Sequence, residues 1–139
     1  PVTLIMGPSF AHEAELREAA GTRLGILRDP PDFVARLAGA RLVVSQGGST
    51  LYELAHLGTP PVVLGEDPHE ITLGDAMAAR GFGRCLGDGI RCSERKIVHE
   101  ITALMQDSAE IERMREAGRA LDVGRGWEHF RKAVEELLA

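Results

Sequence analysis

Residues 45–60, SQGGSTLYELAHLGTP, begin where a run of apolar residues stops. The stretch contains two adjacent glycines, two hydroxyl residues, and then apolar residues at helical spacing, with Glu53 one turn into the expected helix. Such a strand-to-helix junction is typical of α/β proteins, in which parallel strands alternate with helices. The junction therefore decides the fold class, and it raises the question of whether this turn binds a ligand.

Short apolar runs alternate with amphipathic stretches on both sides of the junction. We expect strands at residues 2–6, 23–27, 41–45, 61–65 and 83–86. We expect helices at residues 12–20, 32–38, 50–57, 71–80, 94–106, 109–120 and 127–138. Four of the five strands are almost entirely apolar, as strands buried on both faces should be. The pattern predicts a single α/β domain over residues 1–139: a Rossmann-like parallel sheet of about five strands flanked by helices, with a helical C-terminal region.

The composition is that of a folded globular protein and excludes several classes. The formal charge is −5 and the Lys and Arg residues are scattered, so nucleic acid is not an expected partner. Cys85 and Cys92 lack metal-ligand spacing, and we expect reduced thiols and no metal or cofactor. No apolar run approaches the roughly 20 residues of a membrane helix, so we expect no membrane span and a cytoplasmic protein. In the last helix, Phe130, Val134, Leu137 and Leu138 are expected to pack on the core.

The turn after the third expected strand has the features of an anion site. Gly47 and Gly48 lack side chains, so the backbone can approach a ligand closely and can adopt positive φ. Ser49 and Thr50 add hydroxyl groups beside the free N–H groups of the first helical turn. The helix N-terminus carries about half a positive charge and can hold a phosphate without a basic side chain. Residues 42–57 contain no Lys or Arg, which fits that mechanism, and neither a P-loop nor a GxGxxG motif is present.

Glu53 has two interpretations. By spacing, Thr50 and Glu53 form a capping box, in which each side chain accepts a hydrogen bond from the other residue's backbone N–H. Alternatively, the Glu53 carboxylate lies one turn beyond the phosphate site, where it can accept hydrogen bonds from both hydroxyls of a ribose. The sequence leaves both interpretations open.

Other loops at the ends of expected strands carry weaker signals. Residues 7–9, Gly-Pro-Ser, are typical of a turn followed by a helix cap, and capping also accounts for Asp32. His69 lies in the sequence EDPHE, directly after the fourth expected strand. Ligands of parallel sheets bind at that end of the strands, so His69 is a candidate site residue, with an exposed turn histidine as the alternative. No set of residues with the spacing of a known catalytic motif is present, and the catalytic residues are unknown.

Residues 40–70, ARLVVSQGGSTLYELAHLGTPPVVLGEDPHE, together with AMAARG at 76–81, resemble the C-terminal, nucleotide-sugar-binding half of GT-B enzymes. The resemblance is closest to the hydrolase that removes UDP from a diacetamido-trideoxy sugar in pseudaminic acid synthesis, and to its spore-coat polysaccharide relatives. The N-acetylglucosaminyltransferase that makes lipid II is a more distant likeness. Residues 122–134, DVGRGWEHFRKAV, are similar to the Asp-Gly-Lys-Gly segment that begins the last helix of the hydrolase family.

The resemblance implies roles for individual residues. It implies that the diphosphate of UDP is held by the turn residues Gly47, Gly48, Ser49 and Thr50. Glu53 would accept the ribose hydroxyls, and Asp29 and Pro30 would contact the uracil, chiefly through main chain. Glu70 stands where the family has a glutamine that touches the sugar or the phosphate. A carboxylate there lacks the amide donors and repels a diphosphate, at a cost on the order of a kcal/mol.

From this resemblance we expect the UDP-sugar-binding half of a nucleotide-sugar hydrolase or glycosyltransferase in surface polysaccharide biosynthesis. GT-B enzymes have two such domains with the active site between them. We therefore expect the missing N-terminal domain of the same protein to be a partner, and the 139-residue chain alone to be inactive. The alternative is a stand-alone α/β phosphate- or nucleotide-binding module without catalysis. The sugar, the acceptor, the choice between hydrolysis and transfer, and the oligomeric state are open.

Overall fold

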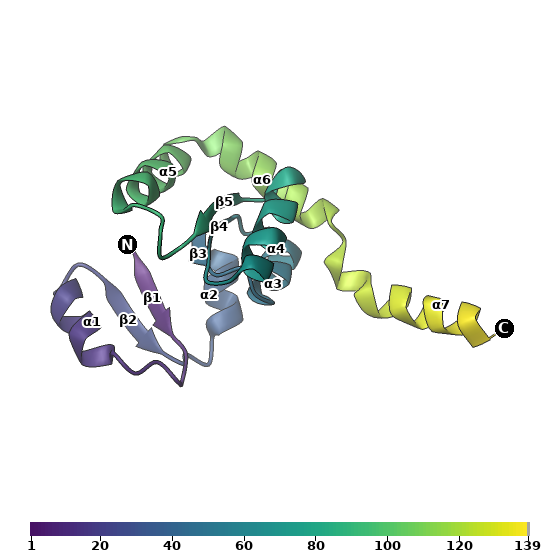
Figure 1. Ribbon diagram of the computed structural model, residues 1–139, viewed down its shortest axis with the longest axis horizontal. Coiled ribbons are helices and arrows are strands. Elements are labelled where there is room, and N and C mark those ends of the chain that lie inside the picture. Colours follow the sequence, from purple (N-terminus) through teal and green to yellow (C-terminus); the bar gives the residue numbers. More distant parts are fainter. Residues whose placement is uncertain (139) are drawn as a thin grey trace. The chain divides into compact units, whose positions relative to one another are not determined.

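The computed structural model describes residues 1–138 and has the expected α/β fold class (Figure 1). Parallel strands alternate with helices up to β5, and the chain is helical after it. The described elements are, in order, β1 (Thr3–Met6), α1 (Glu13–Ala20), β2 (Gly25–Arg28), α2 (Phe33–Gly39), β3 (Val43–Ser45), α3 (Thr50–Leu57), β4 (Pro61–Gly65), α4 (Pro68–Ala79), β5 (Arg84–Asp88), α5 (Glu94–Gln106), α6 (Ser108–Ala120), a 3₁₀ turn η1 (Val123–Arg125) and α7 (Gly126–Leu138).

The chain divides into two compact units, Pro1–Arg36 and Leu37–Ala139, which are described separately. The five strands are those expected, but they belong to two sheets. One sheet consists of β1 and β2, and the other has the order β3-β4-β5. All the pairings are parallel.

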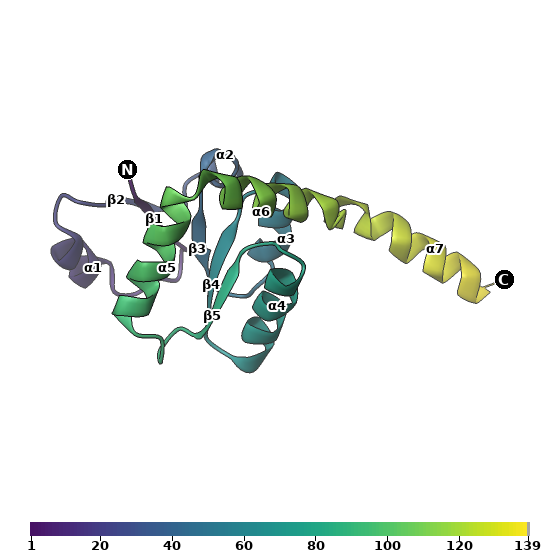
Figure 2. The same ribbon diagram turned by 90° about the horizontal axis from the view of Figure 1, so that it is seen from above.

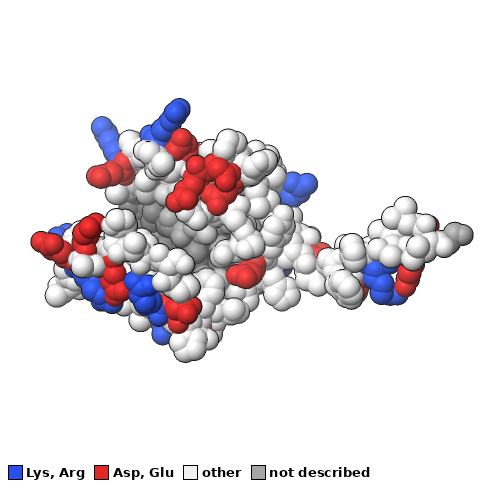
Figure 3. All heavy atoms as spheres, turned by 60° about the horizontal axis from the view of Figure 1, so that its bottom comes forward, with Lys and Arg blue, Asp and Glu red and all other residues white. Residues whose placement is uncertain are grey.

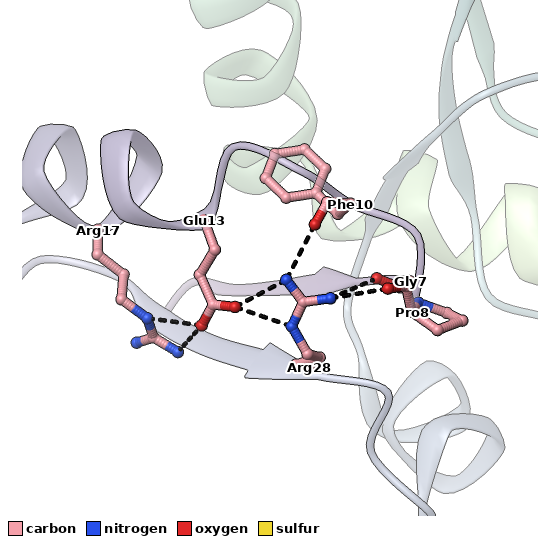
Figure 4. A network of polar contacts seen from close by, with 6 residues as sticks. All are labelled: Gly7, Pro8, Phe10, Glu13, Arg17 and Arg28. Atoms are coloured by element: carbon pink, nitrogen blue, oxygen red, sulfur yellow. Dashed lines mark hydrogen bonds and ion pairs between the residues drawn. The ribbon is translucent and has the colours of Figure 1, made fainter.

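In the first unit, a single arginine ties the loop after β1 to the end of β2 (Figure 4). The Arg28 guanidinium donates hydrogen bonds to the backbone carbonyls of Gly7, Pro8 and Phe10. It also pairs with the carboxylate of Glu13, which in turn accepts from Arg17. The hydrogen bonds from Arg17 and Arg28 hold the pKa of Glu13 below its usual range. The loop after β1 and the first turn of α1 are thereby fixed to the end of β2.

In the second unit, β4 is the buried central strand, with helices on both faces of the sheet (Figure 2). On one face, Gly74 of α4 packs directly against Val63 and Cys85. On the other face, α5 and α6 cover a core cluster that contains Val62, Leu86, Leu104, Ile111 and Met114. The helix α3 lies beside α4, and its buried residues are Leu51, Leu54 and Ala55. This packing holds α3 and α4 with their first turns at the same end of the sheet as the ends of β3 and β4.

Two expectations about helices are wrong. The helix expected at residues 71–80 begins earlier, at Pro68, because Asp67 caps it and Pro68 takes the first helical position, where the missing N–H costs nothing. In α7, none of the residues is buried, although its apolar side was expected to pack on the core. Trp127 and Phe130 stack on each other, with ring centroids 5.6 Å apart, and both are exposed. The helix leads away from the sheet of its unit in both views (Figures 1 and 2).

Candidate functional site

The candidate site lies at the carboxyl end of the three-stranded sheet, where the turn after β3 meets the turn after β4. Ligands of parallel α/β sheets bind at this end, where strands lead into helix N-termini. The turn after β3 contains Gln46, Gly47 and Gly48, and the turn after β4 contains Glu66 and Asp67. Gly47 packs against Glu70, which lies in the first turn of α4.

Gly47 is a packing residue. It is buried, and a Cβ built on it would lie 2.1 Å from the backbone oxygen of Glu70 and 2.5 Å from its carbonyl carbon. Both of these atoms belong to the backbone, so no side-chain rotation could relieve the overlap. The fold itself therefore requires glycine at position 47, independently of any ligand.

Gly48 differs from its neighbour. A Cβ built on Gly48 would find one heavy atom within 4 Å, Oε1 of Glu70 at 3.9 Å, so the packing leaves room for a side chain. Neither Gly47 nor Gly48 has positive φ, which corrects the expectation that this turn exploits the left-handed region. Because neither packing nor backbone conformation requires glycine at 48, close approach by a ligand is a remaining reason for it.

The first turn of α3 is open. Ser49 has helical backbone angles (φ −58°, ψ −27°), and its side chain makes no capping hydrogen bond. The N–H groups of Leu51 and Tyr52 bond to the carbonyls of Gly48 and Ser49, which tightens the turn. Within residues 1–138, no hydrogen bond satisfies the N–H groups of Gly48, Ser49 or Thr50. The open amides therefore lie slightly earlier than the sequence suggested, on the glycine side of the helix start.

The capping box expected from Thr50 and Glu53 is absent. Thr50 is the first residue of the helix, whereas a capping side chain needs the extended backbone of a residue that precedes the helix. Within the described residues, neither side chain has a hydrogen-bond partner, and Glu53 is exposed. Of the two interpretations of Glu53, the capping box is excluded, and the ribose contact stays a prediction.

The first turn of α4, by contrast, is closed by its own chain. Oδ1 of Asp67 accepts hydrogen bonds from the backbone N–H groups of His69 (2.7 Å) and Glu70 (3.0 Å). The hydrogen bond from Glu70 has the largest effect, and together the two bonds lower the pKa of the Asp67 carboxyl below its ordinary value. We did not expect this cap from the sequence. The signal was nevertheless present in the sequence: an Asp followed directly by Pro, with Glu three residues after the Asp, is typical of a helix start.

Glu70 places a carboxylate beside the open turn. Its Oε2 accepts a hydrogen bond from the backbone N–H of Glu66 (2.8 Å), and its Oε1 lies next to Gly48. The side chain is half-buried, and its position is fixed by the bond to Glu66, a residue that the sequence analysis did not single out. An anion at the α3 N-terminus would therefore have a negative neighbour.

The remaining predicted site residues are His69, in the second unit, and Asp29 and Pro30, in the first. His69 has an exposed side chain, and its described hydrogen bond uses the backbone N–H. Asp29 and Pro30 belong to the first unit. Asp29 has an unusual positive φ of 42°, and its N–H donates to the Met6 carbonyl (2.9 Å). A non-glycine residue with positive φ is strained, and such strain is more frequent at binding sites.

Three observations concern other kinds of ligand: the charge on one face, groups that could hold a metal, and helices that could span a membrane. Acidic and basic side chains are intermixed on the face in Figure 3, without a continuous basic area. Among residues 1–138 no group of three or more His, Cys, Asp and Glu side chains is placed to hold a metal ion. Over the same residues, every helix is too short or too polar to cross a bilayer.

Comparison with known proteins identifies the fold through solved structures. No protein-family model matches the chain, and no curated protein matches it. The spinosyn rhamnosyltransferase SpnG is similar over 84% of this chain, with a TM-score of 0.70 and 23% identity. The same figures hold for SpnG complexed with thymidine diphosphate. The glycotransferase of kitacinnamycin is similar over 94% of this chain, with a TM-score of 0.63 and 18% identity.

At these low identities the similarity shows the fold alone, which the chain shares with part of each of these glycosyltransferases. The chain corresponds to 31% of the length of SpnG and 42% of the kitacinnamycin enzyme. These structures give no support to the finer resemblance to a UDP-sugar hydrolase or to the lipid II-forming transferase.

Proposed function

We propose that this chain is the nucleotide-sugar-binding part of a GT-B enzyme and that the diphosphate of the nucleotide binds at the N-terminus of α3. The observation that carries the proposal is the open first turn of α3. The N–H groups of Gly48, Ser49 and Thr50 have no partner in the described residues, beside a glycine that packing does not require. Unpaired amides at a helix start, with the helix dipole behind them, are a site for phosphate groups.

The nucleotide is a pyrimidine nucleoside diphosphate in this proposal. The resemblance of the turn favours UDP, and the similar structure of SpnG with thymidine diphosphate supports the same class of ligand. Exposed Glu53 would accept the ribose hydroxyls. Asp29 and Pro30 would contact the base, as the resemblance implies, and the side chains of His69 and Glu70, next to the turn, would face the sugar, which UDP lacks.

The reaction of the whole protein is transfer or hydrolysis of the sugar, in surface polysaccharide biosynthesis and in the cytoplasm. The turn described above contains no catalytic base, and the proposal assigns the chemistry to a second, N-terminal domain of a longer enzyme. Residues 1–139 then form one nucleotide-sugar-binding domain that binds UDP weakly and does not catalyse. A stand-alone phosphate-binding module is the alternative, and ligand selectivity separates the two.

Calorimetric titration with UDP, thymidine diphosphate, UMP and inorganic phosphate tests the proposal. We expect both diphosphates to bind more tightly than UMP, and phosphate to bind weakest. Gly48→Val fills the space that the phosphate needs and should abolish binding, as should Thr50→Leu. Gly39→Val is the matched control, because Gly39 also has open space around it and no positive φ. Equal binding of all four ligands would show a general anion site and would favour the stand-alone module. Unchanged binding of UDP to the Gly48→Val variant would refute the proposed diphosphate site.

A further inference from the structure

Glu70 is a charged side chain next to the open turn of α3, and several contacts hold it in place. Its backbone packs against Gly47, and a Cβ built on Gly65 would lie 3.3 Å from the Glu70 Cβ. Its backbone N–H donates to Oδ1 of Asp67 (3.0 Å), and its carboxylate Oε2 accepts from the backbone N–H of Glu66 (2.8 Å). The half-buried carboxylate therefore cannot turn away from a ligand without losing a hydrogen bond.

The other carboxylate oxygen, Oε1, lies beside the open amides. Apart from the neighbours of Gly48 in the chain, it is the one heavy atom within 4 Å of a Cβ built on that glycine, at 3.9 Å. The Gly48 N–H is one of the amides to which the proposed function assigns the diphosphate. A phosphate bound at this amide therefore has the Glu70 carboxylate as a neighbour.

The elements around the turn supply no basic side chain to offset this charge. Residues 42–79, which form β3, α3, β4, α4 and the turns between them, contain no Lys or Arg. The turn after β4 instead adds the exposed carboxylates of Glu66 and Asp67. This part of the chain thus leaves the repulsion between Glu70 and a bound phosphate uncompensated.

In the proposed function, the phosphate beside Glu70 is the terminal one. Glu53, the proposed ribose contact, lies one turn further along α3, whereas Glu70 lies at the glycine side of the helix start. The nucleoside end and the sugar end of the ligand then lie on opposite sides of the open amides. The sugar end, with the terminal phosphate, is the end next to Glu70.

The charge of the terminal phosphate differs between a sugar nucleotide and free UDP. In the sugar nucleotide this phosphate is an ester with a single ionisable oxygen. Transfer or hydrolysis breaks the bond between the sugar carbon and the bridging oxygen, and the oxygen keeps the electron pair and stays on the phosphate. A free terminal phosphate loses its second proton near pH 6, so at about pH 7.5 UDP carries about one more negative charge than the sugar nucleotide.

We propose that Glu70 makes the site selective for nucleoside diphosphates with an esterified terminal phosphate, the class that includes sugar nucleotides, over free UDP. The fixed carboxylate repels the terminal phosphate of UDP about twice as strongly as that of an ester, because the repulsion is proportional to the charge. Glu70 thereby favours release of UDP once the sugar has left. The inference rests on the proposed function and adds to it a residue that separates substrate from product.

A purely structural role of Glu70 predicts a different result. Its hydrogen bond to the Glu66 N–H stabilises the turn, and loss of that bond would change the affinity for every ligand by the same factor. Gln keeps an oxygen acceptor for this N–H and removes only the charge. The ratio of the affinities for UDP and for an ester therefore reports the charge alone.

The test is calorimetric titration at about pH 7.5 with UDP, with UDP methylated on its terminal phosphate, and with UDP-glucose. Methylation removes the second charge without adding a sugar. Glu70→Gln should raise the affinity for UDP about fivefold and that for either ester by at most about twofold, and the gains should shrink at high salt. Glu94→Gln is the matched control, because it removes the same charge from an exposed position in the first turn of α5. It should change none of the affinities.

A larger gain for UDP than for both esters, absent in Glu94→Gln, supports the inference. Equal gains for UDP and the esters, no gain for UDP, or the same pattern in Glu94→Gln would overturn the selectivity and leave the nucleotide site in place. If wild type binds none of the three ligands, the proposed nucleotide site itself fails, and the inference fails with it.

Discussion

The helices α3 and α4 follow neighbouring parallel strands and begin at the same end of the sheet, yet their first turns are completed differently. In α4 the carboxylate of Asp67 accepts from two backbone N–H groups. In α3 no side chain caps the first turn, the N–H groups of Ser49 and Thr50 find no acceptor within the described residues, and the position before Ser49 is a glycine with space around it. Both helix starts have the same partial positive charge, so the difference is whether the chain supplies its own anion or leaves the position open for a ligand.

The two adjacent glycines of the turn also differ from each other in what requires them. Gly47 is required by contact with the backbone of Glu70, whereas Gly48 is not required by any contact. A pair of glycines that looks like one motif therefore contains one structural residue and one candidate binding residue. A substitution at Gly47 should therefore lower stability, and a substitution at Gly48 should lower ligand affinity.

The largest expected effect is on the free energy of unfolding of Gly47→Ala. The added Cβ overlaps the Glu70 carbonyl, and the backbone must shift, at a cost of about 2–4 kcal/mol. Gly48→Ala should change stability by no more than about 0.5 kcal/mol. Urea unfolding followed by circular dichroism measures both. Equal stabilities of the two variants would remove the structural distinction between the glycines.

Next in size is the loss of UDP affinity in Gly48→Asp, which gives α3 the kind of acceptor that α4 already has. The new carboxylate would compete for the open amides and repel the diphosphate, and the dissociation constant should rise by about tenfold or more. Gly48→Asn is the matched control, because it fills the same space without a charge, and it should weaken binding by steric blocking alone and therefore by less than Gly48→Asp. If Asp and Asn weaken binding equally, steric blocking rather than charge accounts for the loss.

Removing the α4 cap should give a smaller loss of stability. Asp67→Ala leaves two N–H groups without an acceptor, and the urea midpoint should shift by roughly half as much as in Gly47→Ala. The folded-state pKa of Asp67 lies below its ordinary value of 3.8, so its contribution is complete above that pH and is lost as pH falls through the lowered value. Unfolding curves of wild type and Asp67→Asn should therefore converge under acid conditions. A constant difference at all pH values would argue against an ionised cap.

The smallest expected change is a gain. Glu70→Gln removes the negative charge beside Gly48, while the amide oxygen can still accept from the Glu66 N–H. UDP affinity should rise several-fold, by roughly 1 kcal/mol, because a like charge near the diphosphate is removed. Calorimetry at low and high salt measures the gain, which should shrink as salt increases. Weaker binding of the Gln variant would show that the carboxylate itself contacts the ligand.

The sequence predicts the regular parts of this molecule well, since apolar periodicity locates every strand and helix. The bounds of α3 and α5 match the expected ranges, and the start of α4 was missed because Asp67 and Pro68 were assigned to a loop. Periodicity cannot assign strands to sheets, because pairing depends on which edges meet in space. It also did not reveal that α7 would leave its apolar side exposed.

The position of the turn was predictable from the sequence but its atomic contacts were not, and the anion site itself stays a prediction. Residues 47–50 stand where the sequence suggests an anion site. The role of Gly47 depends on a contact with Glu70, more than 20 residues away, which no local pattern encodes. The spacing of Thr50 and Glu53 fits a capping box. The box does not form because the backbone is already helical at Ser49, one residue before Thr50. Spacing identifies candidates, and backbone geometry decides among them.

The most direct test of the open helix start is a UDP titration followed by amide chemical shifts. The signals of Gly48, Ser49 and Thr50 should move most, and those of His69 and Glu70, whose N–H groups already bond to Asp67, should move little. We predict that the amide signals of residues 48–50 shift to saturation while those of His69 and Glu70 stay unchanged. Equal shifts at both helix starts, or no shift at residues 48–50, would contradict the assignment of the diphosphate to α3.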